Sequence, residues 1–256
     1  MSLRSLLREI CSGIEIYYTG RSEGEYLKTA FILYDDYSEL ASKLWLLNDD
    51  AKWRDTRDKQ SRKYETALKN VAAAAQGTGS ATAEEIALIQ SGGRGDSFKS
   101  YDEVLNDVRV VFDKKRTKEV AALDRLQNAM KARRKQRNGF FHSAHLLSLT
   151  IDKLQCVEAF CDLLDYGELL FRDAWREEIS GVRNLDTLQV LLRLEKKSFG
   201  DPALTERMSR ILQNWPRNDQ ARARGNLVTM HPSDLYLRLC VIHGGPELRR
   251  QLETLL

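Results

Sequence analysis

Apolar side chains recur every three or four residues along most of this chain, the spacing that places them on one side of an α-helix. One such stripe runs from Leu3 to Ile14, and a longer one from Glu25 to about Asn48. Two more long helices are expected, from about Tyr101 to Gln136 and from Phe140 to about Glu178. No stretch has the two-residue alternation of a half-buried strand. The pattern predicts an all-α protein, a helical bundle of long antiparallel helices.

The residues that break helices are few and unevenly distributed: the chain of 256 residues has 4 Pro and 15 Gly. Small and polar residues collect in residues 76–98, where we expect a mobile loop with at most a short helical turn. The stretch from Asp49 to Ala75 is helix-prone and densely charged, so only a narrow face of it should be buried. The predicted division is a bundle over residues 1–181 and a smaller C-terminal helical region, of unknown role, over residues 182–256.

The four cysteines are scattered in apolar surroundings without a Cys-x-x-Cys pair, so neither a disulfide framework nor a zinc site is indicated. The N-terminus lacks the continuous apolar core of a secretory signal, and no apolar run approaches the roughly 20 residues that span a bilayer. We therefore expect a cytoplasmic protein without a membrane partner. The net charge of +3 comes from 40 basic and 37 acidic residues, so only local clustering can argue for nucleic acid.

Positive charge is concentrated where the helix from Tyr101 is expected to end. Asn138-Gly139 is a helix-ending signal, and a new helix starting at Phe140 would have His142 in its first turn. Without a break, Arg137 and His142 would point about 140° apart. Free backbone N–H groups in a first turn favour a phosphate and disfavour an imidazolium. Four more basic residues precede this joint: Lys131, Arg133, Arg134 and Lys135.

The segment Arg137-Asn138-Gly139-Phe140-Phe141-His142 resembles the motif of the HEPN superfamily, which has an arginine, a polar residue, three further residues and a histidine. The resemblance covers roughly the first two-thirds of the chain. It implies an all-helical domain that is often a metal-independent endoribonuclease of toxin, phage-defence or RNA-processing systems. It also implies a homodimer with paired motifs, and an antitoxin or defence-system protein as a possible partner. One branch has a modified tyrosine two residues after the histidine, where this chain has Ala144.

By this resemblance Arg137 and His142 are the catalytic pair, and Asn138 supports them. We expect His142 to remove the proton from a ribose 2′-OH and Arg137 to stabilise the charge on the attacked phosphate. The basic residues Lys131, Arg133, Arg134 and Lys135 would attract the RNA backbone without reading its sequence. No cofactor and no metal ion are expected, because no cluster of carboxylates or histidines has the spacing of a metal site.

Two alternatives remain open at this stage: an HEPN-like module that binds RNA or a protein without cleavage, and a helical interaction protein unrelated to nucleic acid. Each feature also has a structural explanation, since basic residues favour helix C-termini and a histidine beside two phenylalanines could be a core residue. On the second expected helix, Glu25 and Asp35-Asp36 could orient Arg137 or His142, although solvated charge is the simpler interpretation. Other candidates, each with a simpler interpretation as surface or loop residues, are His145, His231, His243, Arg217, Arg222 and Arg224.

Overall fold

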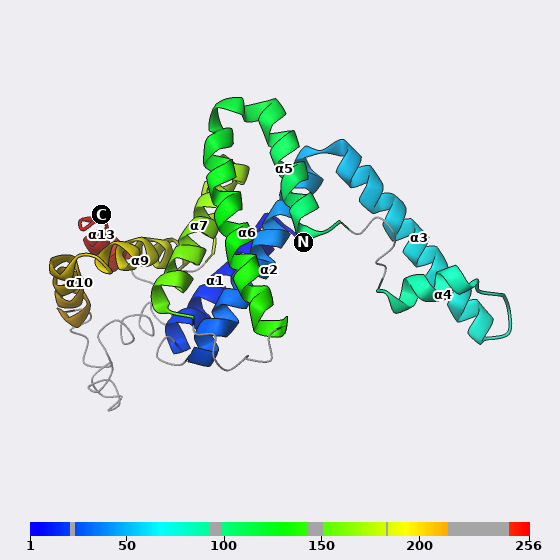
Figure 1. Ribbon diagram of the computed structural model, residues 1–256, viewed down its shortest axis with the longest axis horizontal. Helices are drawn as coiled ribbons and strands as arrows, with labels where there is room; N and C mark the ends of the chain where they lie inside the picture. Colours follow the sequence, from blue (N-terminus) through cyan, green and yellow to red (C-terminus); the bar gives the residue numbers. More distant parts are fainter. Residues whose placement is uncertain (21–23, 93–98, 143–150, 183, 215–245) are drawn as a thin grey trace. The chain divides into compact units, whose positions relative to one another are not determined.

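The computed structural model describes residues 1–20, 24–92, 99–142, 151–182, 184–214 and 246–256 (Figure 1). These residues form helices and no strands, which confirms the predicted all-α class. The helices are α1 (Leu3–Gly20), α2 (Gly24–Asp49), α3 (Ala51–Ala75), α4 (Ala83–Gln90), α5 (Tyr101–Arg116), α6 (Val120–His142), α7 (Lys153–Phe171), α8 (Asp173–Ile179), α9 (Leu185–Ser198), α10 (Pro202–Asn214) and α13 (Pro246–Glu253), with a short 3-10 turn η1 (Thr117–Glu119).

The chain forms two compact units, and the boundary between them lies inside α2. The first unit combines Met1–Ala41 with Ala121–Leu256, and the second is Ser42–Val120. Within the first unit, α9 contacts α7, α10 and α13, so the C-terminal helices belong to the same unit as α1 and α7. The boundary predicted between residues 181 and 182 stays a prediction, and it differs from this division.

The core of the first unit forms around α7. The Asp152 side chain caps the N-terminus of α7 by accepting a hydrogen bond from the backbone N–H of Gln155 at 2.8 Å. In return, the side-chain oxygen of Gln155 accepts a hydrogen bond from the backbone N–H of Asp152. The buried residues of α7 cover about 220° of its circumference, because apolar side chains occur on more than one face. Gly167 on α7 leaves room for the ring of Trp175 on α8, which is 1% exposed. The absence of a side chain at Gly167 therefore permits close packing of α8.

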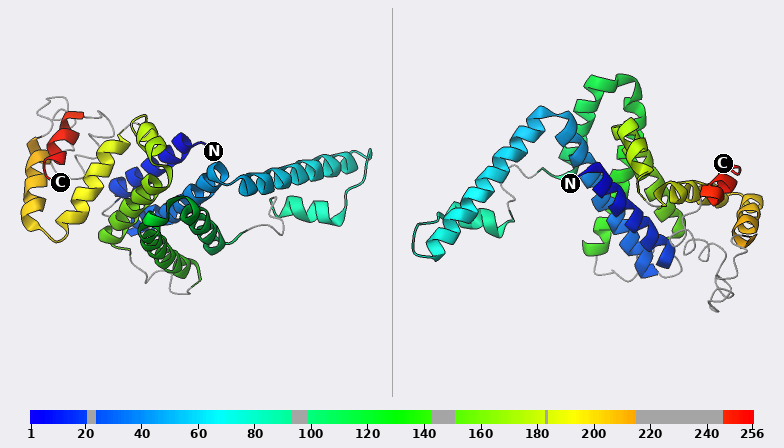
Figure 2. Two further views of the ribbon diagram at one scale, coloured as in Figure 1. Left: turned by 90° about the horizontal axis from the view of Figure 1, so that it is seen from above. Right: turned by 180° about the vertical axis from the view of Figure 1, so that it is seen from behind.

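The second unit contains a helical hairpin of α3 and α4, which lie side by side in both views of Figure 2. Gly77, at φ +69°, adopts a left-handed conformation in the turn after α3. Thr82 and Glu85 form a capping box at the start of α4, and Asn70 of α3 donates to Glu85 at 2.6 Å. Within residues 76–98, where the sequence predicts a mobile loop with a short helical turn, the described residues thus include an eight-residue helix, α4, which is longer than the expected turn. Ala67 is the only buried residue of α3, which agrees with the narrow buried face that the sequence predicts for this helix.

Two predicted helix boundaries near the motif are wrong. The single helix expected from Tyr101 is divided by η1, because the backbone of Arg116 leaves the helical region at φ −146°. The break expected at Asn138-Gly139 is absent, since α6 continues to His142. A glycine inside a helix costs only about 1 kcal/mol relative to alanine, which the packing of α6 against its neighbours can offset.

In the part of the chain that the structure describes, no helix is long and apolar enough to cross a membrane. Cys11, Cys156 and Cys161 are buried and form no disulfide. Burial raises the pKa of each of these thiols to about 12, so none of the three is a thiolate near neutral pH. Cys240 lies outside the described residues.

Candidate functional site

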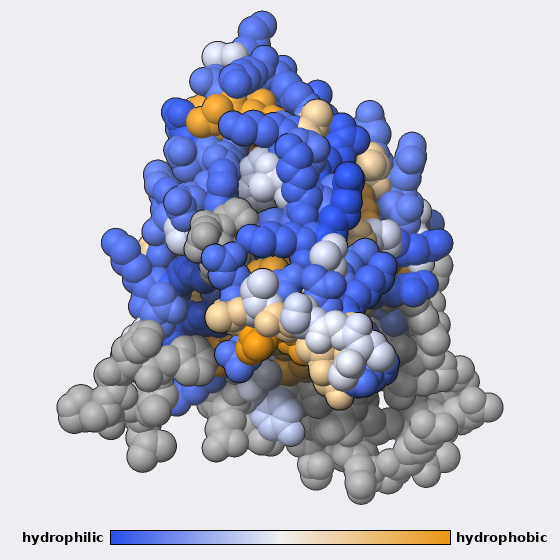
Figure 3. All heavy atoms as spheres, turned by 90° about the vertical axis from the view of Figure 1, so that its right-hand side faces the viewer, coloured by the Kyte–Doolittle hydropathy of each residue, from blue (hydrophilic) through white to orange (hydrophobic). Residues whose placement is uncertain are grey.

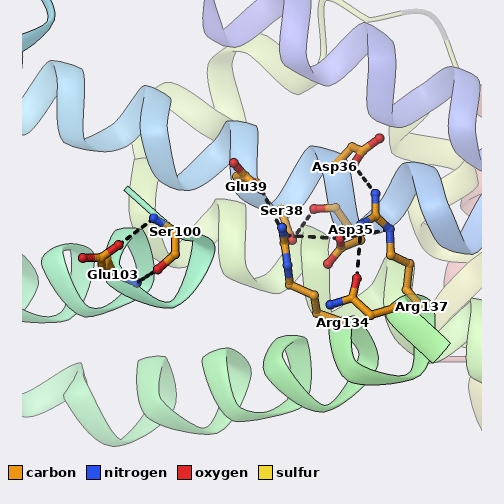
Figure 4. A network of polar contacts seen from close by, with 9 residues as sticks. Asp35, Asp36, Ser38, Glu39, Ser100, Glu103, Arg134 and Arg137 are labelled. Atoms are coloured by element: carbon orange, nitrogen blue, oxygen red, sulfur yellow. Dashed lines mark hydrogen bonds and ion pairs between the residues drawn. The ribbon is translucent and has the colours of Figure 1, made fainter. Parts of the chain in front are cut away.

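Arg137 is the arginine of the motif, and carboxylates from α2 hold its side chain (Figure 4). Its Nε lies 3.6 Å from Oδ2 of Asp35, and one terminal nitrogen lies 3.4 Å from Oδ1 of Asp36. The other terminal nitrogen donates to the amide oxygen of Asn138 at 3.3 Å. The side chain of Arg137 is 22% exposed. The guanidinium is thus fixed by three neighbours while part of it stays accessible.

Asp35 is the buried centre of this arrangement, with a fully buried side chain on α2. It follows directly after Tyr34 and four residues after Phe31, both buried, so it lies beside the apolar stripe of the helix. Burial raises the pKa of Asp35 to about 6, although the charges of Arg134 and Arg137 act in the opposite direction. The carboxylate is therefore ionised at neutral pH in a site that tolerates it only because of these two guanidinium groups.

Arg134 approaches the same carboxylate from one turn earlier in α6. Its Nη1 lies 3.3 Å from Oδ2 of Asp35 and donates to Oε2 of Glu39 at 3.0 Å. Residues three apart on a helix share one side, so Arg134 and Arg137 both face α2. Three carboxylates, from Asp35, Asp36 and Glu39, surround these two guanidinium groups. The cluster therefore has about one excess negative charge when all its carboxylates are ionised.

Arg133 has a different set of partners, on α2 and α7. It donates to Oδ2 of Asp162 at 2.6 Å and to the hydroxyl of Tyr34 at 3.2 Å, and its guanidinium lies 5.5 Å from the centre of the Tyr34 ring. The side chains of Arg133 and Asp162 are each 15% exposed. An ion pair this well buried links the helices, and removal of one partner would leave an uncompensated charge.

The predicted RNA-binding residues therefore have unlike environments. Arg133 and Arg134 make intramolecular ion pairs with buried or half-buried carboxylates. Lys135 is exposed and Lys131 is half-buried. The structure thus gives Arg133 and Arg134 a clear role in joining helices, whereas RNA binding by any of the four stays a prediction.

Arg137 and His142 lie on one continuous helix, so the predicted helix joint does not bring them together. Residues five apart on a regular helix point about 140° apart. His142 is the last residue of α6 and is not part of a first helical turn. The expectation that free N–H groups of a first turn would favour a phosphate and disfavour an imidazolium at His142 is therefore wrong. The His142 side chain lies outside the described residues, as do those of Phe140 and Phe141.

Other candidates from the sequence lie outside the described part of the chain. His145 lies within residues 143–150, which are outside the described residues. The side chain of Glu25 is outside the described part as well. Residues 215–245 contain the remaining histidine and arginine candidates, which are His231, His243, Arg217, Arg222 and Arg224. Among the described residues, no group of three or more His, Cys, Asp or Glu side chains could hold a metal ion.

The interpretation of Asp35 as a solvated charge is wrong, because its side chain is buried. Its neighbour Asp36 is 51% exposed, so the two adjacent carboxylates have different environments. Tyr34, Ser38 and Ser42 are buried on the same helix, and this row of polar groups beside apolar ones was the available signal. A helix face with several polar side chains in a buried stripe indicates that a charged partner from another helix will pair with them.

Comparison of the chain with protein-family models, with curated proteins and with solved structures finds no match. The resemblance to the HEPN superfamily therefore rests on the residues of the motif, and no family is assigned.

Proposed function

We propose that this protein is a metal-independent endoribonuclease in which Arg137 and His142 act on the RNA phosphodiester. The observation that carries the proposal is the contact between Arg137 and the buried carboxylate of Asp35. A guanidinium held in this way needs little reorganisation when charge develops on a phosphate, which is the condition for effective electrostatic stabilisation.

In the proposed reaction His142 accepts the proton of a ribose 2′-OH, and the resulting oxygen attacks the adjacent phosphorus. The bond to the 5′-oxygen of the next nucleotide breaks, which leaves a 2′,3′-cyclic phosphate and a free 5′-OH. Arg137 balances the negative charge on the non-bridging oxygens, and Asn138 holds its guanidinium. The half-exposed carboxylate of Asp36 occupies one terminal nitrogen of Arg137 until phosphate displaces it.

The angle between Arg137 and His142 on α6 supports a working unit of two chains. Side chains about 140° apart on one helix do not converge on one phosphate without help from another element. A second copy related by a two-fold axis would bring its own motif against the first, so that each phosphate meets an arginine and a histidine. A second histidine could then protonate the leaving oxygen.

The proposal is tested by incubation of the full chain with mixed RNA, with and without EDTA. We expect cleavage in both conditions and products that end in 2′,3′-cyclic phosphate or its hydrolysis product. His142→Ala should lower the rate by roughly 10² to 10⁴. The matched control is Arg210→Ala, an exposed arginine of α10 paired with Glu206, which should cleave at the wild-type rate. Full activity in His142→Ala, or ends with 3′-OH and 5′-phosphate, would contradict the mechanism.

A second candidate is an RNA- or protein-binding module of the same fold without catalysis. The observation that favours it is the charge balance around Arg137, where three carboxylates face two guanidinium groups. An excess of negative charge opposes the approach of a phosphate. Salt-dependent RNA binding without any cleavage, unchanged in His142→Ala, would favour this second function over the first.

A further inference from the structure

The helix α3 has an unusual charge distribution for a structural element of this size. It contains seven basic and three acidic residues, a net charge of +4 that exceeds the +3 of the whole chain. Five of the seven basic residues fall within a sector about 120° wide on a regular helix. We call this sector the α3 cationic face, and it consists of Lys52, Lys59, Arg62, Lys63 and Lys69.

All five side chains of the α3 cationic face are exposed. Lys59 pairs with Asp55 at 2.8 Å, a surface contact of small energetic value. The other four make no ion pair with any residue that the structure describes. This contrasts with Arg133 and Arg134, whose charges pair with buried carboxylates. Exposed cations that have no ion-pair partner among the described residues are the groups that remain available for an external anion.

Asn70 points in the same direction as Lys52 and donates to Glu85 of α4, but most of the packing of α3 uses another side of the helix. Ala67 is buried, and Tyr64 and Val71 are half-buried, on a side outside the α3 cationic face. The Trp53 indole donates to Asp107 of α5 at 2.9 Å on that same side. Glu85 of the adjacent α4 has partners of its own, since it is bound by Asn70 and by the cap at Thr82.

We propose that the α3 cationic face binds the phosphate backbone of nucleic acid, independently of the α6 motif. The face extends over eighteen residues, Lys52 to Lys69, or about 25 Å of helix, so it matches a linear polyanion better than one small anion. Its basic residues are mostly lysines, which act as point charges toward phosphate and read no base sequence. Binding should therefore have little preference among sequences and should not require the ribose 2′-OH.

An anionic membrane is the competing partner for a basic helix, and the residues of this face argue against it. A helix that lies in a membrane interface needs a face of large apolar side chains beside its basic one. The α3 cationic face contains no large apolar residue. Leu68 is the one exposed large apolar residue of α3, and it lies on another side of the helix. The face of the molecule drawn in Figure 3 is mainly hydrophilic, with apolar atoms in smaller patches.

Fluorescence anisotropy with labelled single-stranded DNA and RNA of about 30 nucleotides tests this proposal on the full chain. DNA lacks the 2′-OH and cannot be cleaved by the proposed reaction, so its binding is measured without loss of the probe, and the α3 variants identify the share that depends on α3. Lys52→Gln/Lys63→Gln should weaken binding of both probes roughly tenfold and should flatten the plot of log K against log salt by about 1.4, which is 0.7 for each lost contact. Glutamine keeps helix propensity, so circular dichroism should be unchanged.

The matched control is Lys114→Gln/Lys118→Gln, which removes the same charge from exposed residues of α5 and η1. The control should bind DNA with wild-type affinity. Equal loss in both double variants would mean that only net charge matters, and wild-type affinity of Lys52→Gln/Lys63→Gln would also overturn the proposal. So would binding to vesicles of anionic phospholipid without binding to either nucleic acid. DNA binding through α3 without RNA cleavage would leave this inference standing while the proposed nuclease activity failed.

Discussion

The carboxylate of Asp35 lies 3.6 Å from Nε of Arg137, although the two residues are 102 positions apart in the sequence. The contact joins α2 to α6 across the buried centre of the first unit. Because the acid is fully buried and the arginine is partly exposed, the pair extends from the core to the surface. A change in the core can therefore reach the side chain that we propose for catalysis.

Asp35→Asn should lower RNA cleavage by roughly 10- to 100-fold, because loss of the buried charge releases the guanidinium of Arg137 from its position. The measurement is the single-turnover rate at saturating enzyme, which separates the chemical step from RNA binding. Asp173→Asn, on an exposed aspartate of α8 that, among the described residues, pairs only with Arg176 of the same helix, is the control and should cleave near the wild-type rate. If both variants cleave like the wild type, Asp35 does not position Arg137 for the reaction.

The same variant should have a pH-dependent effect on the free energy of unfolding. Burial raises the pKa of Asp35 from 3.8 to about 6, so the folded state binds this proton more tightly than the unfolded state. The contribution of Asp35 to stability is therefore fully present below pH 3.8 and is lost as the pH rises through about 6.

Asparagine cannot ionise, so the stability of Asp35→Asn relative to the wild type should increase from pH 4 to pH 7, by up to about 3 kcal/mol. Urea unfolding at several pH values in this range measures the difference. A difference that stays constant over the range would show that the carboxyl does not titrate there. A relative stability that rises toward neutral pH together with a lower activity is typical of charges that are buried for function.

Arg137→Lys should not restore the activity lost in Arg137→Ala. A guanidinium offers several donors in one plane, and Asp35, Asp36 and Asn138 each contact a different nitrogen of it. An ammonium is a compact point charge, so a lysine at this position cannot contact Asp35, Asp36 and Asn138 and also bind a phosphate. Cleavage rates of the two variants provide the comparison, and full activity of the lysine variant would mean that local positive charge is sufficient.

The protein should be a homodimer under working conditions. Light scattering at micromolar concentration should give twice the chain mass of 29.4 kDa. Mixing an Arg137→Ala chain with a His142→Ala chain should restore part of the activity, because a composite site then contains one intact copy of each residue. A monomer whose rate stays proportional to enzyme concentration at high dilution would exclude the composite site.

Gly167→Ala should destabilise the first unit by about 1 to 3 kcal/mol, because a Cβ at this position would overlap the ring of Trp175. The ring is 1% exposed and has no solvent side into which it could move easily. Gly200→Ala is the control, since a Cβ there has no heavy atom within 4 Å. Thermal unfolding by circular dichroism measures both variants, and equal melting temperatures would contradict the packing described for α7 and α8.

The local sequence determined the helical class and most of the helix positions. The three-and-four spacing of apolar residues predicted the stripes of α1 and α2, and Leu6, Ile10 and Ile14 are buried as that spacing requires. The charge density of α3 predicted its narrow buried face for the same reason, since seven exposed cations cannot be packed into a core. These features depend on residues within a few turns of one another, so the sequence was sufficient for them.

Tertiary contacts decided what happens at the motif. Asn138-Gly139 has the local signature of a helix end, yet α6 continues through it to His142, because the cost of one glycine is small beside the packing of the helix. Asp35 is directly followed in sequence by the exposed Asp36, and only its pairing with Arg134 and Arg137 permits its burial. The sequence alone determined that arginines precede the motif. Which of them face carboxylates, and which cations of α3 stay free of such partners, depends on residues brought together from distant parts of the chain.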